Sequence, residues 1–119
     1  MNALDPLPAA DSPLKAAAFV VRRAAGSQTP PTPLVFASPH SGRYYPEDMM
    51  SAAVLDAVSI RRSEDAFVDD LIADAPEHGA ALITANYARA YIDLNREAFE
   101  LDASMFADEL PEHARGRSA

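Results

Sequence analysis

Side chains that could carry out chemistry fall into three short motifs. His40 lies in a Pro-His-Ser-Gly sequence, the adjacent acids Glu64 and Asp65 follow an Arg-Ser pair, and residues 89–96 read Arg-Ala-Tyr-Ile-Asp-Leu-Asn-Arg. The chain has no cysteine, so a zinc ion would need imidazole or carboxylate ligands. His40 with one of the two acids predicts part of a zinc site that leaves positions open for water and substrate.

Each motif also has a simpler interpretation. A loop histidine is more often an ordinary surface or capping residue than a metal ligand. Acids such as Glu64 and Asp65 are favoured in the first turn of any helix, because the helix dipole stabilises negative charge there. Residues 89–96 could form a half-exposed strand held by salt bridges. The single motifs leave these alternatives open.

The segment 89–96 is the most informative of the three. In an extended strand, alternation places Arg89, Asp93 and Asn95 on one face. The planar guanidinium of an arginine binds a carboxylate through two parallel hydrogen bonds. Asn95 adds a neutral donor, and Asp93 can orient an arginine. The segment therefore predicts a strand that binds carboxylates.

The elements that must position these motifs alternate in type. A strand at 34–37 ends directly before the His40 loop, at the sheet edge where α/β proteins bind ligands. Ser63 is expected to cap a second helix, which ends near Gly79. The order indicates an α/β layer structure. The expected elements are a strand or helical turn within 16–22, strands at 34–37, 80–84 and 90–94, and helices at 52–58 and 63–78.

Proline content divides the chain in two. Six of its ten prolines lie in the first 33 residues, so 1–33 is expected to be a partly ordered leader rich in proline and alanine. Residues 34–119 are expected to form the N-terminal portion of a single domain. A few short strands would leave a sheet with open edges, which stable proteins usually pair or cover. We therefore expect the fold to be incomplete in this chain.

Charge and hydropathy exclude several classes of partner. The 119 residues carry a net charge of -8, which argues against binding to nucleic acid. The longest apolar stretch is far shorter than the roughly 20 residues of a membrane span. The first residues lack the basic region of a secretory signal. A soluble, cytoplasmic protein is expected.

Taken together, the motifs carry a family resemblance. Pro39-His-Ser-Gly, then Arg62-Ser-Glu-Asp-Ala-Phe-Val-Asp, then Arg89-Ala-Tyr-Ile-Asp-Leu-Asn-Arg, in this order, resemble the N-formylglutamate amidohydrolase family. The likeness covers about residues 34–102. It extends to the wider group of zinc carboxypeptidases and aspartoacylases, in which an Asn-Arg pair binds a substrate carboxylate.

The resemblance implies an enzyme and a fold. The activity would be zinc-dependent hydrolysis of N-formyl-L-glutamate to formate and L-glutamate, a late step of histidine degradation. The fold would be the three-layer α/β type of zinc exopeptidases. Two alternatives are a related amidohydrolase of N-acyl amino acids and a non-catalytic module that binds carboxylates.

The resemblance also implies a role for each motif. Zinc would be bound by His40 and by a carboxylate, for which Asp65 is favoured over Glu64. A further histidine ligand and the general base are expected outside this chain, so we expect weak metal binding and little turnover from it alone. The carboxylates of the dianionic substrate would be bound by Arg89, Asn95 and Arg96, with Asp93 orienting them.

Overall fold

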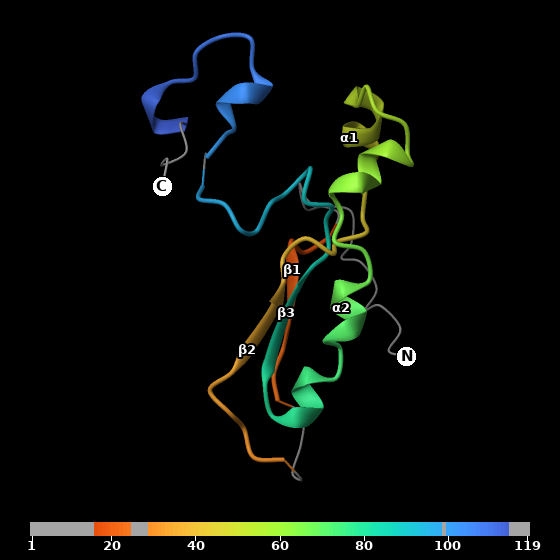
Figure 1. The fold of residues 1–119 in the computed structure, drawn as a ribbon, viewed down its shortest axis with the longest axis vertical. Coiled ribbons are helices and arrows are strands. Elements are labelled where there is room, and N and C mark those ends of the chain that lie inside the picture. The colour runs from red at the N-terminus through yellow and green to blue at the C-terminus, as the bar shows by residue number, and fades with distance from the viewer. Residues whose placement is uncertain (1–15, 25–28, 99, 115–119) are drawn as a thin grey trace.

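A three-stranded sheet organises the chain. The computed structural model describes residues 16–24, 29–98 and 100–114. Strands β1 (Phe19–Arg22), β2 (Val35–Ser38) and β3 (Ala81–Ala85) form a sheet in the order β1-β3-β2 (Figure 1). The central strand β3 pairs antiparallel with β1 and parallel with β2.

The strand predictions at 34–37 and 80–84 are confirmed to within one residue. Of the two possibilities for 16–22, the structure has the strand, β1. It lies inside the predicted leader, whose residues 1–15 are outside the described part. In β3, Leu82 and Ala85 are buried, as expected for the middle strand of a sheet.

Short helical segments connect the strands. Pro46 precedes α1 at the cap position, and the acidic first turn of α1 suits a helix start. The predicted helix at 52–58 is wrong, because Ala53 is extended and ends α1. The Asp56 carboxylate then accepts hydrogen bonds from the backbone nitrogens of Val58 and Ser59, before the separate segment η1 begins. The segments are α1 (Glu47–Ala52), η1 (Ser59–Ser63), α2 (Val68–Leu71), η2 (Ala75–His78), η3 (Ala103–Met105) and η4 (Glu112–Ala114).

The predicted helix at 63–78 is also wrong in its extent. Ser63 ends η1 instead of capping a helix, and its hydroxyl donates to the carbonyl of Ile60. Glu64 is extended, and Phe67 has a left-handed backbone with φ of 64°. Helical structure resumes only at α2 and, after a break, at η2. Tertiary contacts made by residues 64–67 override the helical pattern of the sequence.

The predicted strand at 90–94 is absent. The carbonyl of Ala88 accepts hydrogen bonds from the backbone nitrogens of Tyr91 and Ile92, which makes the segment turn. After β3, Tyr87 continues the pairing through an isolated parallel bridge to Tyr44. The alternation that would have placed Arg89 and Asn95 on one strand face therefore does not occur.

The two faces of the sheet differ. On one face, Leu82 packs with Ala75 and Ala80, and Ile72 adds to this small core. The other face includes Phe19, Val21 and Val35, which stay 46%, 52% and 68% exposed. The described part is thus a mixed α/β structure with helical segments on one face of its sheet.

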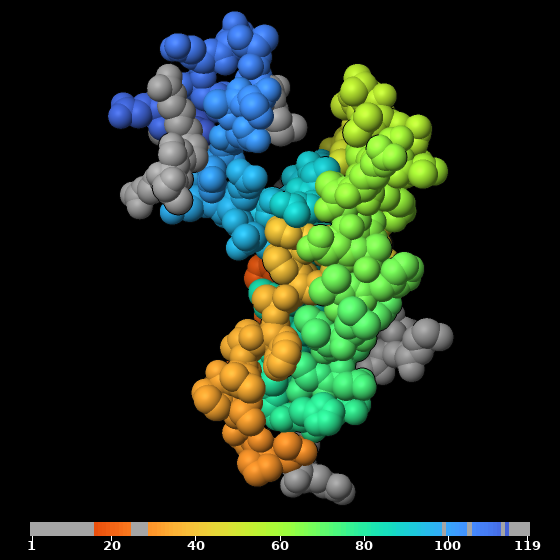
Figure 2. Space-filling model, viewed as in Figure 1, coloured from red at the N-terminus to blue at the C-terminus, as the bar shows by residue number. Residues whose placement is uncertain are grey.

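The described residues form an elongated body. Figure 2 shows residues 100–114 and the α1–η1 region as two separate projections at one end, with the sheet below them. No helix in the described ranges is long and apolar enough to cross a lipid bilayer.

Candidate metal and carboxylate site

The His40 loop begins where β2 ends and is held against the chain that leaves β3. Tyr44 donates a backbone hydrogen bond to the carbonyl of Asn86, and Ala88 donates one to the carbonyl of Tyr44. Gly42 makes this approach possible, because a Cβ there would lie 1.8 Å from the backbone oxygen of Tyr87. The glycine of the first motif therefore lets two backbone segments meet.

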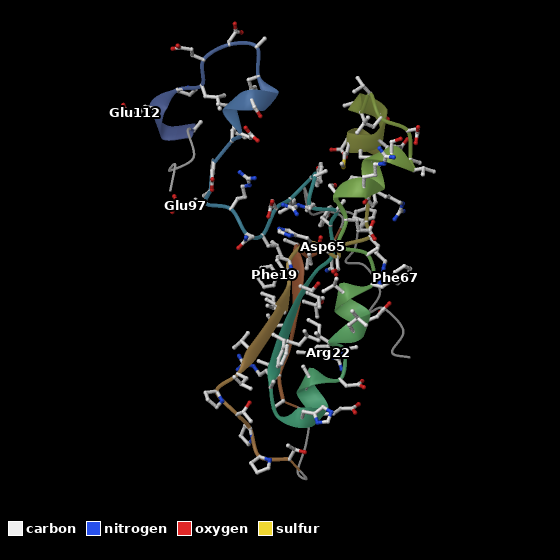
Figure 3. The ribbon with its side chains drawn as sticks, viewed as in Figure 1. Phe19, Arg22, Asp65, Phe67, Glu97 and Glu112 are labelled. Atoms are coloured by element: carbon white, nitrogen blue, oxygen red, sulfur yellow. The ribbon has the colours of Figure 1, made fainter. Side chains whose placement is uncertain are left out.

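Asp65 is brought to this loop by hydrogen bonds along its own backbone. Its nitrogen donates to the carbonyl of His40 at 3.0 Å, and its carbonyl accepts from the hydroxyl of Ser41 at 2.8 Å. Ser41 also bonds to the hydroxyl of the buried Ser38. These contacts explain why residues 64–67 leave the helical path. Figure 3 shows Asp65 at the end of the sheet where β1 begins and β3 ends.

The ring of His40 lies between two carboxylates. Nδ1 is 3.4 Å from Oδ2 of Asp65, and Nε2 is 2.9 Å from Oδ1 of Asp93. The side chains of His40 and Asp93 are 13% and 17% exposed, whereas that of Asp65 is 52% exposed. Each nitrogen of the ring is therefore directed at a different acid.

The contact between His40 and Asp93 is not among the predictions from the sequence. The two residues are separated by 53 positions, and no spacing rule links them. One signal was available. The His40 loop follows β2, and the segment with Asp93 follows the neighbouring parallel strand β3, so both leave the sheet at the same edge.

Asp93 connects the histidine to the basic residues. Its Oδ2 lies 3.2 Å from Nη2 of Arg89 and 3.6 Å from Nε of Arg96, and its Oδ1 also accepts from the backbone nitrogen of Asn95. Burial by itself would raise the pKa of Asp93. The hydrogen bonds from Asn95 and His40 and the charges of His40 and Arg89 outweigh burial and hold this pKa below its usual value.

Glu64 is turned toward a different group. Its carboxylate accepts from the hydroxyl of Tyr45 at 2.8 Å and from Arg61 at 3.1 Å, and its side chain is only 7% exposed. Burial and this hydrogen bond raise the pKa of Tyr45 to about 12. Arg61 also lies over the Tyr45 ring, 4.5 Å from its centroid. Of the two acids, only Asp65 therefore faces His40.

The structure thus brings together four of the seven predicted site residues, namely His40, Asp65, Asp93 and Arg89. Arg96 lies at the margin and also approaches Glu100 at 3.6 Å, and the Asn95 side chain is exposed. Within the described ranges, no three histidine or acidic side chains are arranged to hold a metal ion. The arrangement offers two metal-ligand atoms beside two arginines.

Comparison with known proteins agrees with the motifs. The crystal structure of N-formylglutamate amidohydrolase from Ralstonia eutropha JMP134 is similar, with a TM-score of 0.65 and 36% identity over 80% of this chain. The match spans 33% of that protein, so this chain corresponds to about a third of its length. No curated protein sequence matches significantly. The sequence profile of the N-formylglutamate amidohydrolase family matches residues 32–118. The chain therefore belongs to the N-formylglutamate amidohydrolase family.

Proposed function

We propose that this chain supplies half of the zinc site and the basic substrate site of an enzyme that hydrolyses N-formyl-L-glutamate to formate and L-glutamate. The cluster of His40, Asp65, Asp93 and Arg89 carries the proposal, because it sets two metal-ligand atoms beside a guanidinium group. Family membership supports the choice of an amide bond as the target. The reaction would serve histidine degradation in the cytoplasm.

The separation of two ligand atoms supports zinc. Typical zinc–nitrogen and zinc–oxygen bonds of about 2.0–2.2 Å at a tetrahedral angle place two ligand atoms roughly 3.3–3.5 Å apart. Nδ1 of His40 and Oδ2 of Asp65 are 3.4 Å apart. Glu64 is the weaker candidate, because its carboxylate is already bonded to Tyr45 and Arg61. The remaining ligands and the general base would come from outside this chain.

Asp93 suits the role of a partner to the metal-binding histidine. Zinc-binding histidines usually donate their second ring nitrogen to a carboxylate, which fixes the tautomer and raises the basicity of the ligand atom. If Nδ1 of His40 binds zinc, Nε2 carries the proton and donates to Oδ1 of Asp93 at 2.9 Å. The same carboxylate holds Arg89 through its other oxygen. Asp93 would thus fix the distance between the zinc-binding ring of His40 and the substrate-binding guanidinium of Arg89.

The basic residues suit a dianionic substrate. Formyl is a small group, so most binding energy must come from the two carboxylates of N-formylglutamate. Arg89 and Arg96 provide positive charge in a chain with a net charge of -8. In the bound state one of them would exchange part of its contact with Asp93 for a substrate carboxylate. Zinc, when bound, would polarise the formyl carbonyl and lower the pKa of a bound water.

We further propose that the complete fold has three layers, as in zinc exopeptidases. The exposed side chains of Phe19, Val21 and Val35 support this, because an apolar sheet face of this kind is normally covered by a second helical layer.

Zinc titration tests the proposed ligands. We expect weak zinc binding by the 119-residue chain, loss of that binding in His40→Ala, and unchanged binding in His78→Ala, a matched change at an exposed histidine of η2. Asp65→Asn should weaken binding more than Glu64→Gln. Equal zinc affinity of the chain and His40→Ala would refute the site. Binding of glutamate without any zinc binding would instead favour the non-catalytic module.

Substrate assays test the reaction. The chain alone should show little or no turnover, since its described part supplies two ligands and no general base. A longer form of the protein that contains it should release formate from N-formyl-L-glutamate faster than acyl groups from N-acetyl-L-glutamate or N-formyl-L-aspartate. A preference for another N-acyl amino acid would favour the related amidohydrolase.

A further inference from the structure

A pocket lies beside α1, and none of the seven predicted site residues lines it. Its volume is about 490 Å³. One wall comes from the first turn of α1 and the chain before it, and the other from the segment that leaves β3. Its lining residues are Tyr44, Pro46, Glu47, Asp48, Ser51, Tyr87 and Tyr91.

Three tyrosine rings form an ordered wall of this pocket. Tyr87 is 1% exposed, and its hydroxyl bonds to both the backbone nitrogen and the carbonyl of Ala16. Tyr91 stacks on it with ring centroids 5.4 Å apart and planes at 20°. Tyr44 meets the Tyr87 ring edge-on at 5.0 Å. Both outer rings are therefore positioned by a buried central ring.

The charges that line the pocket are all negative. Glu47 and Asp48 lie in the first turn of α1, and no arginine or lysine is among the lining residues. Within the described ranges neither carboxylate has a basic side chain within 4.0 Å. Asp48 instead accepts a hydrogen bond from the hydroxyl of Tyr91 at 3.0 Å, which raises the pKa of that tyrosine. Two carboxylates without counter-charge disfavour an anion and favour a cation.

We propose that this pocket binds a small organic cation, an alkylammonium compound, between the tyrosine rings and the carboxylates of Glu47 and Asp48. The faces of aromatic rings attract cations, and organic ammonium groups are typical ligands of such sites. The carboxylates provide the charge, and Tyr91 joins the two parts through its bond to Asp48. This site is independent of the proposed amidohydrolase function, whose substrate is an anion.

Matched ligands separate charge from shape. In titrations of the 119-residue chain followed by NMR, we expect tetramethylammonium and butylammonium to shift tyrosine signals with millimolar affinity. The uncharged compounds tert-butanol and 1-butanol have similar shapes and should bind at least about tenfold more weakly. Equal binding of charged and neutral compounds, or no saturable shift, would overturn the proposal.

Matched variants locate the site. Asp48→Asn and Tyr91→Leu should each weaken ammonium binding at least about fivefold, whereas Glu77→Gln, the same charge change on η2, should leave it unchanged. Glu47→Gln alters an exposed side chain and keeps a test available if Tyr91→Leu fails to fold. Undiminished binding in both Asp48→Asn and Glu47→Gln would refute the site. His40→Ala should affect zinc alone, so the two proposed sites can fail separately.

Discussion

Two regions of the sheet differ in how their side chains are satisfied: the end that carries His40, and the face with Phe19, Val21 and Val35, here called the open face. At the His40 end, hydrogen bonds join segments that are far apart in sequence, and no buried side-chain oxygen or nitrogen within the described ranges lacks a partner. On the open face, Phe19, Val21 and Val35 are exposed apolar groups. Buried polar groups therefore find their hydrogen-bond partners within the described residues, whereas these apolar side chains are left exposed to solvent.

The difference shows that positioning and stability depend on different contacts. The core of Ala75, Ala80 and Leu82 is small, so burial of apolar surface in this cluster contributes little to the folding free energy of the described residues. The site is held mainly by close backbone approach and by hydrogen bonds of Asp65 and Asp93. Changes at the His40 end should therefore have large effects on structure, and changes on the open face small ones.

Gly42→Ala should have the largest effect. The new methyl group would lie 1.8 Å from the carbonyl oxygen of Tyr87, and backbone atoms cannot move away as a flexible side chain can. We expect a loss of roughly 3 kcal/mol or more of unfolding free energy, or no cooperative folding. Urea unfolding followed by circular dichroism measures it.

Ala52→Gly, at the end of α1, is a matched control for this exchange of glycine and alanine. It should cost about 1 kcal/mol or less. If Gly42→Ala were as stable as the wild type, the close contact between the His40 loop and the end of β3 would be incorrect.

Asp93→Asn should have the next largest effect. The change removes the charge that holds His40, Arg89 and Arg96 and should cost about 1–3 kcal/mol at pH 7. The folded-state pKa of Asp93 lies below its unfolded value of about 3.9, so its stabilising effect is complete above that value and is lost as the pH falls through the folded pKa. The stability curves of the two proteins should therefore approach each other as the pH falls through the folded-state pKa of Asp93. A constant difference from pH 7 to pH 2 would contradict the ionic role of Asp93.

Much of the sheet could be predicted from the sequence. The strands at 35–38 and 81–85 are short apolar runs with turn residues around them, and such runs specify strands locally. The helix at 63–78 could not be predicted correctly. Its apolar spacing is helical, but long-range hydrogen bonds to His40 and Ser41 pull Asp65 out of helical geometry.

The residues of the candidate site were predicted better than their arrangement. His40, Asp65, Arg89 and Asp93 were all singled out, but the strand expected to align Arg89 with Asn95 is a turn. In this turn Arg89 and Asp93 meet because they are four residues apart, as on a helix surface. The contact between Asp93 and His40 depends on the parallel pairing of β2 and β3, which local spacing does not encode.

Val35→Lys tests the open face. Val35 lies on the edge strand β2 and is 68% exposed, so the change should alter the unfolding free energy by less than about 1 kcal/mol. Edge strands with exposed apolar residues favour association between chains, and a lysine opposes it. We therefore expect less self-association in light scattering. Ala57→Lys, at an exposed position away from the sheet, serves as the control. An equal reduction in both variants would point to net charge as the cause.

Phe67→Gly should have the smallest effect, and an opposite sign. Phe67 has φ of 64°, a conformation that costs a side chain with a Cβ about 1–2 kcal/mol. The residue is 67% exposed and directly precedes α2, on the side away from the sheet (Figure 3). Glycine removes this strain. It also loses the contact between the Phe67 ring and Arg43, whose Cζ lies 5.7 Å from the ring centroid, and it increases the entropy of the unfolded chain; both of these effects lower stability. A net gain of about 0.5 kcal/mol in unfolding free energy is expected. Phe67→Ala keeps the Cβ and loses the ring, so it should be less stable than Phe67→Gly. The reverse order would show that backbone strain at position 67 contributes less than the extra entropy that glycine has in the unfolded chain.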